Sequence, residues 1–137
     1  MDKLLKNKKL LVSLFVALLL VLLFINMTAT PESDNKVVSI NSQQARDLIE
    51  SEPNLIILDV REPHEFQGGH IPGAILIPLG ILQEHLDTLN PDSPILLVCR
   101  SGNRSMQAAR ILVDEGFTNL YNLSGGMLEW SYDVEID

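Results

Sequence analysis

The sequence predicts an α/β fold in which helices flank a mostly parallel, five-stranded sheet on both faces, preceded by an N-terminal transmembrane helix. Two short runs, residues 55–58 and 95–98, are apolar without interruption, as is typical of strands buried on both faces of a sheet. Stretches with helical spacing lie between such runs. Strands that alternate with helices indicate parallel pairing, with ligands bound beyond the carboxyl ends of the strands.

The individual elements follow from periodicity and from the residues that start and stop them. Five strands are expected, at residues 36–40, 55–58, 74–77, 95–98 and 120–123. Helices are expected at residues 42–50, 81–89 and 105–115, with single helical turns at 63–66 and 126–130. Asn41 or Ser42 caps the first helix. Pro53 and Pro91 follow the first two helices, and Gly116 ends the third, because these residues do not continue a helix.

The N-terminus combines a basic segment with a long apolar run. Residues 1–9 contain four lysines, and residues 10–25 are apolar except for Ser13. At about 1.5 Å per residue, such a run approaches the roughly 30 Å hydrocarbon thickness of a bilayer. We therefore expect residues 10–29 to form an uncleaved transmembrane anchor. A cleavable signal sequence is the alternative, although residues 26–30 offer only a poor cleavage site.

The lysines also predict the orientation of the chain. Positively charged residues flank the cytoplasmic end of a membrane span, so the N-terminus is expected in the cytoplasm. The remaining domain is then extracytoplasmic, either periplasmic or extracellular, and secreted if the leader is cleaved. The N-terminal helix would make the membrane a partner of the chain.

Residues 30–35 are polar and are expected to be a linker, and residues 36–137 are about as many as one ordinary core needs. We therefore expect a single domain there. Residues 30–137 contain 6 basic and 17 acidic side chains, a net charge of −11, which excludes nucleic acid as an expected partner because phosphate binding needs Lys and Arg. One cysteine cannot form an internal disulfide. His64 and His85 lack neighbours at metal-ligand spacing, so neither a metal site nor a cofactor is expected.

That single cysteine, Cys99, lies where the strand at 95–98 ends and a polar loop leads into the next helix. The start of a helix carries unpaired N–H groups and a partial positive charge, which stabilise a thiolate or an anionic substrate. Arg100 and Arg104 favour the thiolate further. A buried, inert cysteine is the alternative interpretation, but the two arginines favour an active site.

The rest of the loop can shape an anion-binding cradle. Gly102 accepts positive φ angles, which let successive N–H groups converge on one point, and Asn103 also tolerates left-handed geometry. Ser105 is expected to cap the following helix.

The loop from Cys99 to Ser105 resembles the Cys-x-x-Gly-x-Arg-Ser active-site loop of rhodanese domains, which are sulfurtransferases. Three more segments resemble family motifs in the same order: Asp-Val-Arg at 59–61, Gly-His-Ile-Pro-Gly-Ala at 69–74, and Gly-Gly at 125–126 with Trp130. The resemblance covers roughly residues 36–131 and implies the family's fold and activity.

The resemblance implies a persulfide mechanism. Cys99 would take sulfur from thiosulfate or a related small anionic donor and pass it to cyanide or a thiol; a protein acceptor is not identified. The backbone N–H groups of residues 100–104, which include Ser101, Gly102 and Asn103, would hold the persulfide, and Arg100 and Arg104 would attract the donor.

Other polar residues receive structural interpretations. Asp59 and Arg61 are expected to form an ion pair that fixes the neighbouring loop. His70 is expected to be a hydrogen-bonded scaffold residue, and Glu62 and Glu65 are expected to be solvated.

Two other functions stay open. Phosphatase or arsenate reductase chemistry also uses a cysteine, a helix start and an arginine, but those loops place five residues between Cys and Arg, whereas four separate Cys99 from Arg104. The shorter loop favours sulfur over phosphate. A non-enzymatic persulfide carrier or redox-sensing module at the membrane would need the same cysteine, so the sequence does not separate it from an enzyme.

Overall fold

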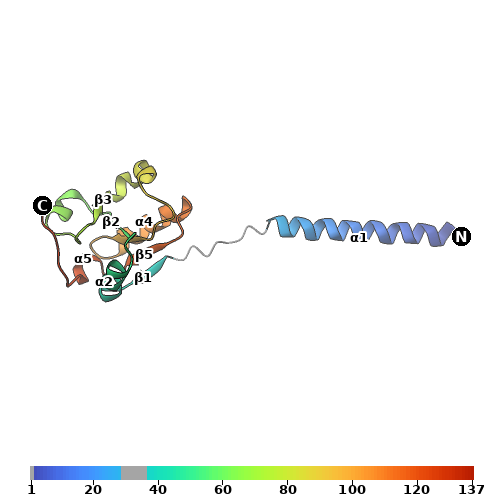
Figure 1. Cartoon of the computed structure of the whole chain (residues 1–137). Coiled ribbons are helices and arrows are strands. Elements are labelled where there is room, and N and C mark those ends of the chain that lie inside the picture. Colours follow the sequence, from blue (N-terminus) through green and yellow to red (C-terminus); the bar gives the residue numbers. More distant parts are fainter. Residues whose placement is uncertain (1, 29–36) are drawn as a thin grey trace. The chain divides into compact units, whose positions relative to one another are not determined.

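Figure 1 shows the computed structural model of the chain, which describes residues 2–28 and 37–137. The chain divides into two compact units, Met1–Asp34 and Asn35–Asp137. Helix α1 (Asp2–Thr28) belongs to the first unit, and the sheet belongs to the second. The predicted linker at 30–35 lies outside the described residues.

The predicted transmembrane anchor at residues 10–29 is not supported. A spanning helix needs about 20 consecutive apolar residues, and among the residues that the structure describes no helix is both long enough and apolar enough to cross a membrane. This finding corrects the predictions that depended on the anchor: the membrane as a partner, and a domain held across it from a cytoplasmic N-terminus.

The second unit confirms the predicted α/β fold with a parallel, five-stranded sheet. Its strands are β1 (Val38–Ile40), β2 (Ile56–Asp59), β3 (Ile75–Leu76), β4 (Ile95–Val98) and β5 (Leu120–Leu123). They lie in the order β1-β5-β4-β2-β3, and each adjacent pair is parallel. Strand β4 is therefore the middle strand, and the carboxyl ends of β2 and β4 are neighbours because Asp59 pairs with Val98.

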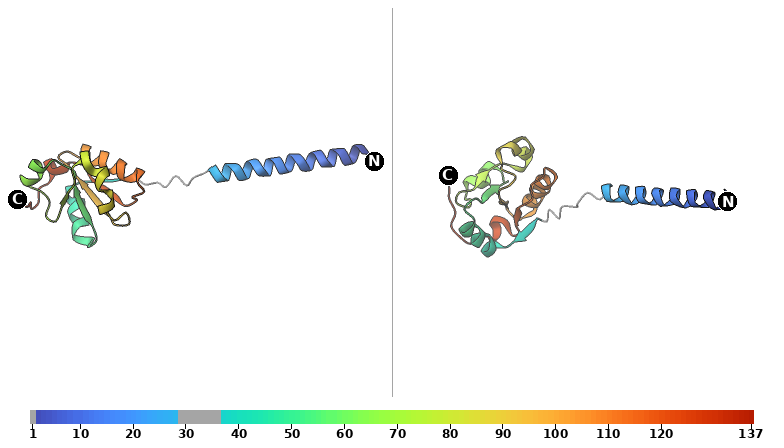
Figure 2. Two further views of the ribbon diagram at one scale, coloured as in Figure 1. Left: turned by 90° about the horizontal axis from the view of Figure 1, so that it is seen from above. Right: turned by 45° about the vertical axis from the view of Figure 1, so that its right-hand side comes forward.

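Helices cover both faces of this sheet. They are α2 (Ser42–Ser51), α3 (Pro63–Gln67), the 3₁₀ helix η1 (Leu79–Thr88), α4 (Asn103–Asp114) and α5 (Gly126–Glu129). Figure 2 shows α2 and α4 on opposite sides of the sheet. Asn41 caps α2 in a reciprocal arrangement: its side chain accepts from the Gln44 N–H at 2.9 Å, and its own N–H donates to the Gln44 side chain at 3.0 Å.

Alternate residues along β4 pack into two hydrophobic cores, one on each face of the sheet. Ile95, Leu97 and Cys99 pack with Ala108, Ala109 and Leu112 of α4 and with Leu82 of η1. Leu96 and Val98 pack on the other face with Ala45 of α2 and Ile71. A strand buried on both faces places Cys99, the next residue in this alternation, in the core beneath α4.

Two helices differ from the sequence prediction. The helix expected at 105–115 begins two residues earlier, at Asn103, because Gly102 adopts a left-handed conformation with φ +93° and turns the chain directly into the helix. The helix expected at 81–89 is a 3₁₀ helix, in which Ile81 N–H donates to the Pro78 carbonyl and Leu89 N–H to the Leu86 carbonyl.

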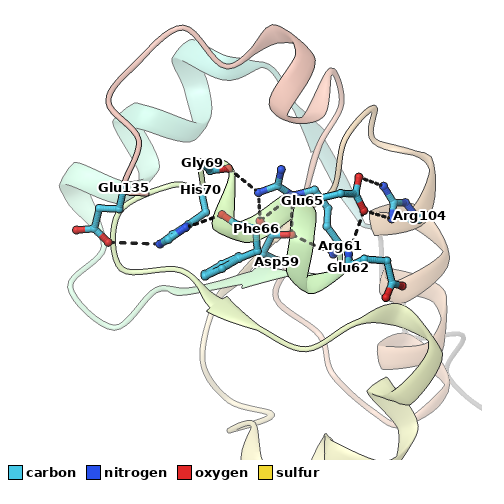
Figure 3. Close-up of polar contacts among 9 residues, drawn as sticks. All are labelled: Asp59, Arg61, Glu62, Glu65, Phe66, Gly69, His70, Arg104 and Glu135. Carbon is cyan, nitrogen blue, oxygen red and sulfur yellow. Dashed lines mark hydrogen bonds and ion pairs between the residues drawn. The ribbon is translucent and has the colours of Figure 1, made fainter. Parts of the chain in front are cut away.

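The C-terminal segment returns to the loop that precedes β3. His70 and Glu135 exchange two backbone hydrogen bonds, at 3.0 and 2.9 Å, and Figure 3 shows the two side chains side by side. This antiparallel bridge fixes the end of the chain against a turn that lies 65 residues earlier in the sequence.

Candidate active site

Cys99 directly follows β4 and exposes no surface. Its Sγ accepts two hydrogen bonds, from the Gly102 N–H at 3.1 Å and from the Ser105 hydroxyl at 3.3 Å. Ser105 is itself buried in the first turn of α4. The sequence predicted Ser105 as a helix cap. Its hydroxyl donates to the Cys99 sulfur instead, and Gly102 occupies the capping position.

The surroundings of the sulfur favour its anionic form. Burial acts to raise the pKa of the Cys99 thiol, but the Ser105 hydroxyl and the backbone N–H groups of Ser105, Ser101 and Gly102 outweigh it and hold that pKa below the ordinary value. Hydrogen bonds to a charged form favour that form. These donors come from the loop and from the first turn of α4.

Only glycine fits at position 102. In addition to its positive φ, a Cβ there would lie 2.9 Å from the Ser124 carbonyl oxygen and 3.1 Å from that of Leu123. The Gly102 carbonyl accepts a hydrogen bond from the Asn122 side-chain amide at 3.3 Å. Asn122 is buried in β5, and its Oδ1 has no partner among the described residues. The Asn122 side chain therefore holds Gly102, whose own N–H donates to the sulfur. The sequence did not predict this role.

The first turn of α5 holds the other side of the loop. The Met127 N–H donates to the Cys99 carbonyl at 2.9 Å, and the Leu128 N–H donates to the Arg100 carbonyl at 3.0 Å. Gly126 adopts φ +56°, and a Cβ at this position would lie 2.5 Å from the Cys99 carbonyl oxygen. Gly126 is therefore needed for the close approach of two backbones.

The two arginines of the loop differ in their surroundings. Arg104 donates two hydrogen bonds to the Glu65 carboxylate, both at 2.7 Å (Figure 3). Arg100 is exposed, and no ion pair joins it to a residue in the described part of the chain. Ser101 and Asn103 are also exposed. The interpretation of Glu65 as solvated is wrong: the Arg104 guanidinium lowers the pKa of Glu65 to about 2, and Glu65 in turn raises the pKa of Arg104.

Asp59 and Arg61 lie beside the loop, at the carboxyl end of β2. Arg61 Nε donates to both carboxylate oxygens of Asp59 at 3.0 Å, and Nη2 donates to Oδ2 at 2.8 Å. Nη2 also donates to the Gly69 carbonyl at 2.9 Å. Both side chains are buried. Val60 N–H, between them, donates to the Val98 carbonyl at 2.9 Å, so this pair is attached to the strand that carries Cys99.

A family model described as a rhodanese-like domain matches residues 41–133. The chain belongs to the rhodanese-like domain family.

Relatives of this rhodanese-like chain include YrkF of Bacillus subtilis, whose name describes it provisionally as a sulfur carrier protein. The two are 36% identical over 104 residues, which cover 76% of this chain and 56% of YrkF, so the chain spans little more than half of that relative. The thiosulfate sulfurtransferase GlpE of Pseudoalteromonas translucida is 34% identical over 91 residues, which cover 66% of this chain and 86% of GlpE.

Among solved structures, a rhodanese-related protein from Thermoplasma volcanium has a TM-score of 0.66 and 32% identity. The match covers 73% of this chain and 99% of that one.

His70 of the rhodanese-like domain holds the turn after α3 against that helix. Its Nδ1 donates to the Phe66 carbonyl at 3.0 Å, and its ring stacks on Phe66 with centroids 3.7 Å apart. The imidazole is buried. No group of three or more metal-ligating side chains occurs among the residues that the structure describes.

Proposed function

We propose that this chain is a sulfurtransferase in which Cys99 carries the transferred sulfur as a persulfide. The observation that supports the proposal is the pair of hydrogen bonds that Cys99 Sγ accepts from Gly102 and Ser105. Such donors stabilise a sulfur anion and prepare it as a nucleophile. The similarity to GlpE, which is named a thiosulfate sulfurtransferase, agrees with this activity.

The proposed reaction has two steps. In the first, the Cys99 thiolate attacks the outer sulfur of thiosulfate or a related sulfane donor; the donor's S–S bond breaks, sulfite leaves with the electron pair, and a Cys99 persulfide anion remains. In the second, cyanide or a thiolate attacks the terminal sulfur, and the Cys99 thiolate leaves. The N–H groups of residues 100–104 hold the persulfide, and Arg100, which follows Cys99 in the chain and is exposed, attracts the anionic donor.

A persulfide carrier is the second candidate. Because Cys99 is buried, every donor and acceptor, small or large, can contact Sγ only after the loop moves, and a single loading step is compatible with such slow access. A carrier needs to load only one sulfur and to deliver it to a specific protein thiol. The name of the relative YrkF agrees with this alternative.

Phosphatase-type chemistry has less support. An enclosed phosphate needs the loop arginine as a ligand, whereas both Arg104 donors that the structure pairs are directed at Glu65. The spacing of four residues between Cys99 and Arg104, one fewer than in phosphatase loops, also argues against phosphate chemistry.

The test is thiocyanate formation from thiosulfate and cyanide by the full chain and by its Cys99→Ser variant, with p-nitrophenyl phosphate as a counter-substrate. We expect turnover that needs Cys99 and no phosphate release. If one sulfur loads onto Cys99 without turnover, the carrier is the better account. Phosphate release that depends on Cys99 would contradict both sulfur functions.

A further inference from the structure

The Glu65–Arg104 pair joins two segments that border the candidate site. Glu65 lies in α3, and Arg104 lies in the first turn of α4, five residues after Cys99. The two hydrogen bonds are both 2.7 Å long, and the side chains are 19% and 32% exposed. A bidentate arginine–carboxylate pair of this kind is geometrically specific, so the positive charge of Arg104 is held against a fixed negative charge.

This pairing changes the charge that an incoming donor meets. Arg104 is close enough to Cys99 for a negative sulfur to raise the pKa of the guanidinium. Arg61 is likewise paired, with Asp59. Of Arg61, Arg100 and Arg104, only Arg100 has no ion-pair partner in the described part of the chain. Arg100 alone attracts a doubly charged donor less strongly than Arg100 and Arg104 would together if Arg104 had no carboxylate partner.

We propose that Glu65 is a specificity-determining residue: by neutralising Arg104, it lowers the preference of the site for dianionic donors and favours sulfane-sulfur donors that carry one negative charge, such as thiosulfonates and persulfides. This inference rests on the proposed sulfur transfer to Cys99 and adds the charge class of the donor. Coulomb energy scales with the charge of the ligand, so a change of one unit at the site affects a dianion twice as much as a monoanion.

The test compares thiosulfate, a dianion, with methanethiosulfonate, a monoanion with a sulfane sulfur in the same chemical position. In both cases Cys99 attacks the outer sulfur, and sulfite or methanesulfinate leaves with the electron pair. The quantity measured is the ratio of kcat/KM for thiosulfate to kcat/KM for methanethiosulfonate, with cyanide as acceptor and the full chain as enzyme. Loss of folded protein or of loop order lowers both values and largely cancels in the ratio.

Glu65→Gln should raise this ratio on the order of fivefold, the effect of one partly screened unit charge near a protein surface. The Gln amide oxygen can still accept from Arg104 and keep it in place. Glu65→Asp retains the carboxylate and should leave the ratio close to that of the parent.

Glu62→Gln is the matched control. It removes the same charge from the residue that precedes α3, but Glu62 makes no ion pair with Arg104 and acts on it only through its charge. Figure 3 shows its carboxylate turned away from the guanidinium. Its ratio should change by less than about twofold.

A second measurement on the parent chain does not depend on any variant. Sulfate and methanesulfonate differ by one charge, and as competitive inhibitors they should have inhibition constants within about threefold of each other if Arg104 is neutralised. Sulfate binding more than tenfold tighter, or an unchanged ratio in Glu65→Gln, would overturn the inference. The proposed function fails separately, if neither donor transfers sulfur to Cys99.

Discussion

Cys99 and Asp59 are buried ionisable residues at the ends of neighbouring strands, but their anionic forms are stabilised in different ways. The Asp59 carboxylate accepts three side-chain hydrogen bonds from a cation, Arg61. The Cys99 sulfur accepts hydrogen bonds from neutral groups, the Gly102 N–H and the Ser105 hydroxyl. A cation compensates the charge of the carboxylate and makes it structural. Neutral donors lower the pKa of the thiol without forming an ion pair with the sulfur, and a sulfur anion that is not held by a cation remains a nucleophile.

The largest loss of folding stability should come from breaking the Asp59–Arg61 pair. Arg61→Ala leaves the Asp59 carboxylate buried without its cation, which in other proteins costs about 3–5 kcal/mol of folding free energy. Urea unfolding measures this loss. Arg46→Ala is the control, because the Arg46–Glu50 pair is exposed and exposed ion pairs contribute little to folding stability. Equal losses in the two variants would contradict the structural role of the buried pair.

The complementary change removes one neutral donor from the sulfur. Ser105→Ala should raise the pKa of Cys99, because the hydroxyl's hydrogen bond to the sulfur favours the thiolate. The ultraviolet absorbance of the thiolate, recorded against pH, reports this shift. Ser101→Ala keeps its backbone N–H and should leave the pKa unchanged. A Ser105→Ala protein whose thiolate titrates as in the parent would show that the hydroxyl is not a donor to the anion.

Glu65 represents an intermediate case, a cation-paired carboxylate that is partly exposed. Its pKa of about 2 in the folded chain lies below the ordinary 4.5, so its contribution to stability is complete above about pH 4.5. That contribution is lost as the pH falls from about 4.5 towards 2. Solvent screening limits it to roughly 1 kcal/mol. Unfolding at pH 5.5 and pH 2.5 should therefore show a smaller acid-induced loss in Glu65→Gln than in the parent, and identical losses would refute the pairing.

The sequence was informative where a signal is local. Strands β2 and β4 are predicted because their apolar runs are unbroken, and the cap of α2 is predicted because Asn41 lies next to a helical pattern. The position of Cys99 at a strand end and a helix start follows from the same patterns. These features depend on neighbours within a few residues.

The remaining features depend on contacts between distant residues. Glu65 reaches Arg104 across 39 positions, and a carboxylate on a short helical turn is otherwise indistinguishable from a solvated one. The start of α4 was predicted two residues late because a serine before a helix ordinarily caps it. In the structure the Ser105 side chain instead donates a hydrogen bond to the Cys99 sulfur. The role of Asn122 has no local pattern, since its partner is a backbone carbonyl in another loop.

The complete burial of Cys99 also sets a kinetic limit. Before sulfur can be transferred, the atoms that cover Sγ have to move apart, and this motion has its own rate. At low donor concentration the rate of persulfide formation should increase in proportion to the donor. At high concentration it should reach a plateau equal to the opening rate, and two chemically different donors should then share the same plateau.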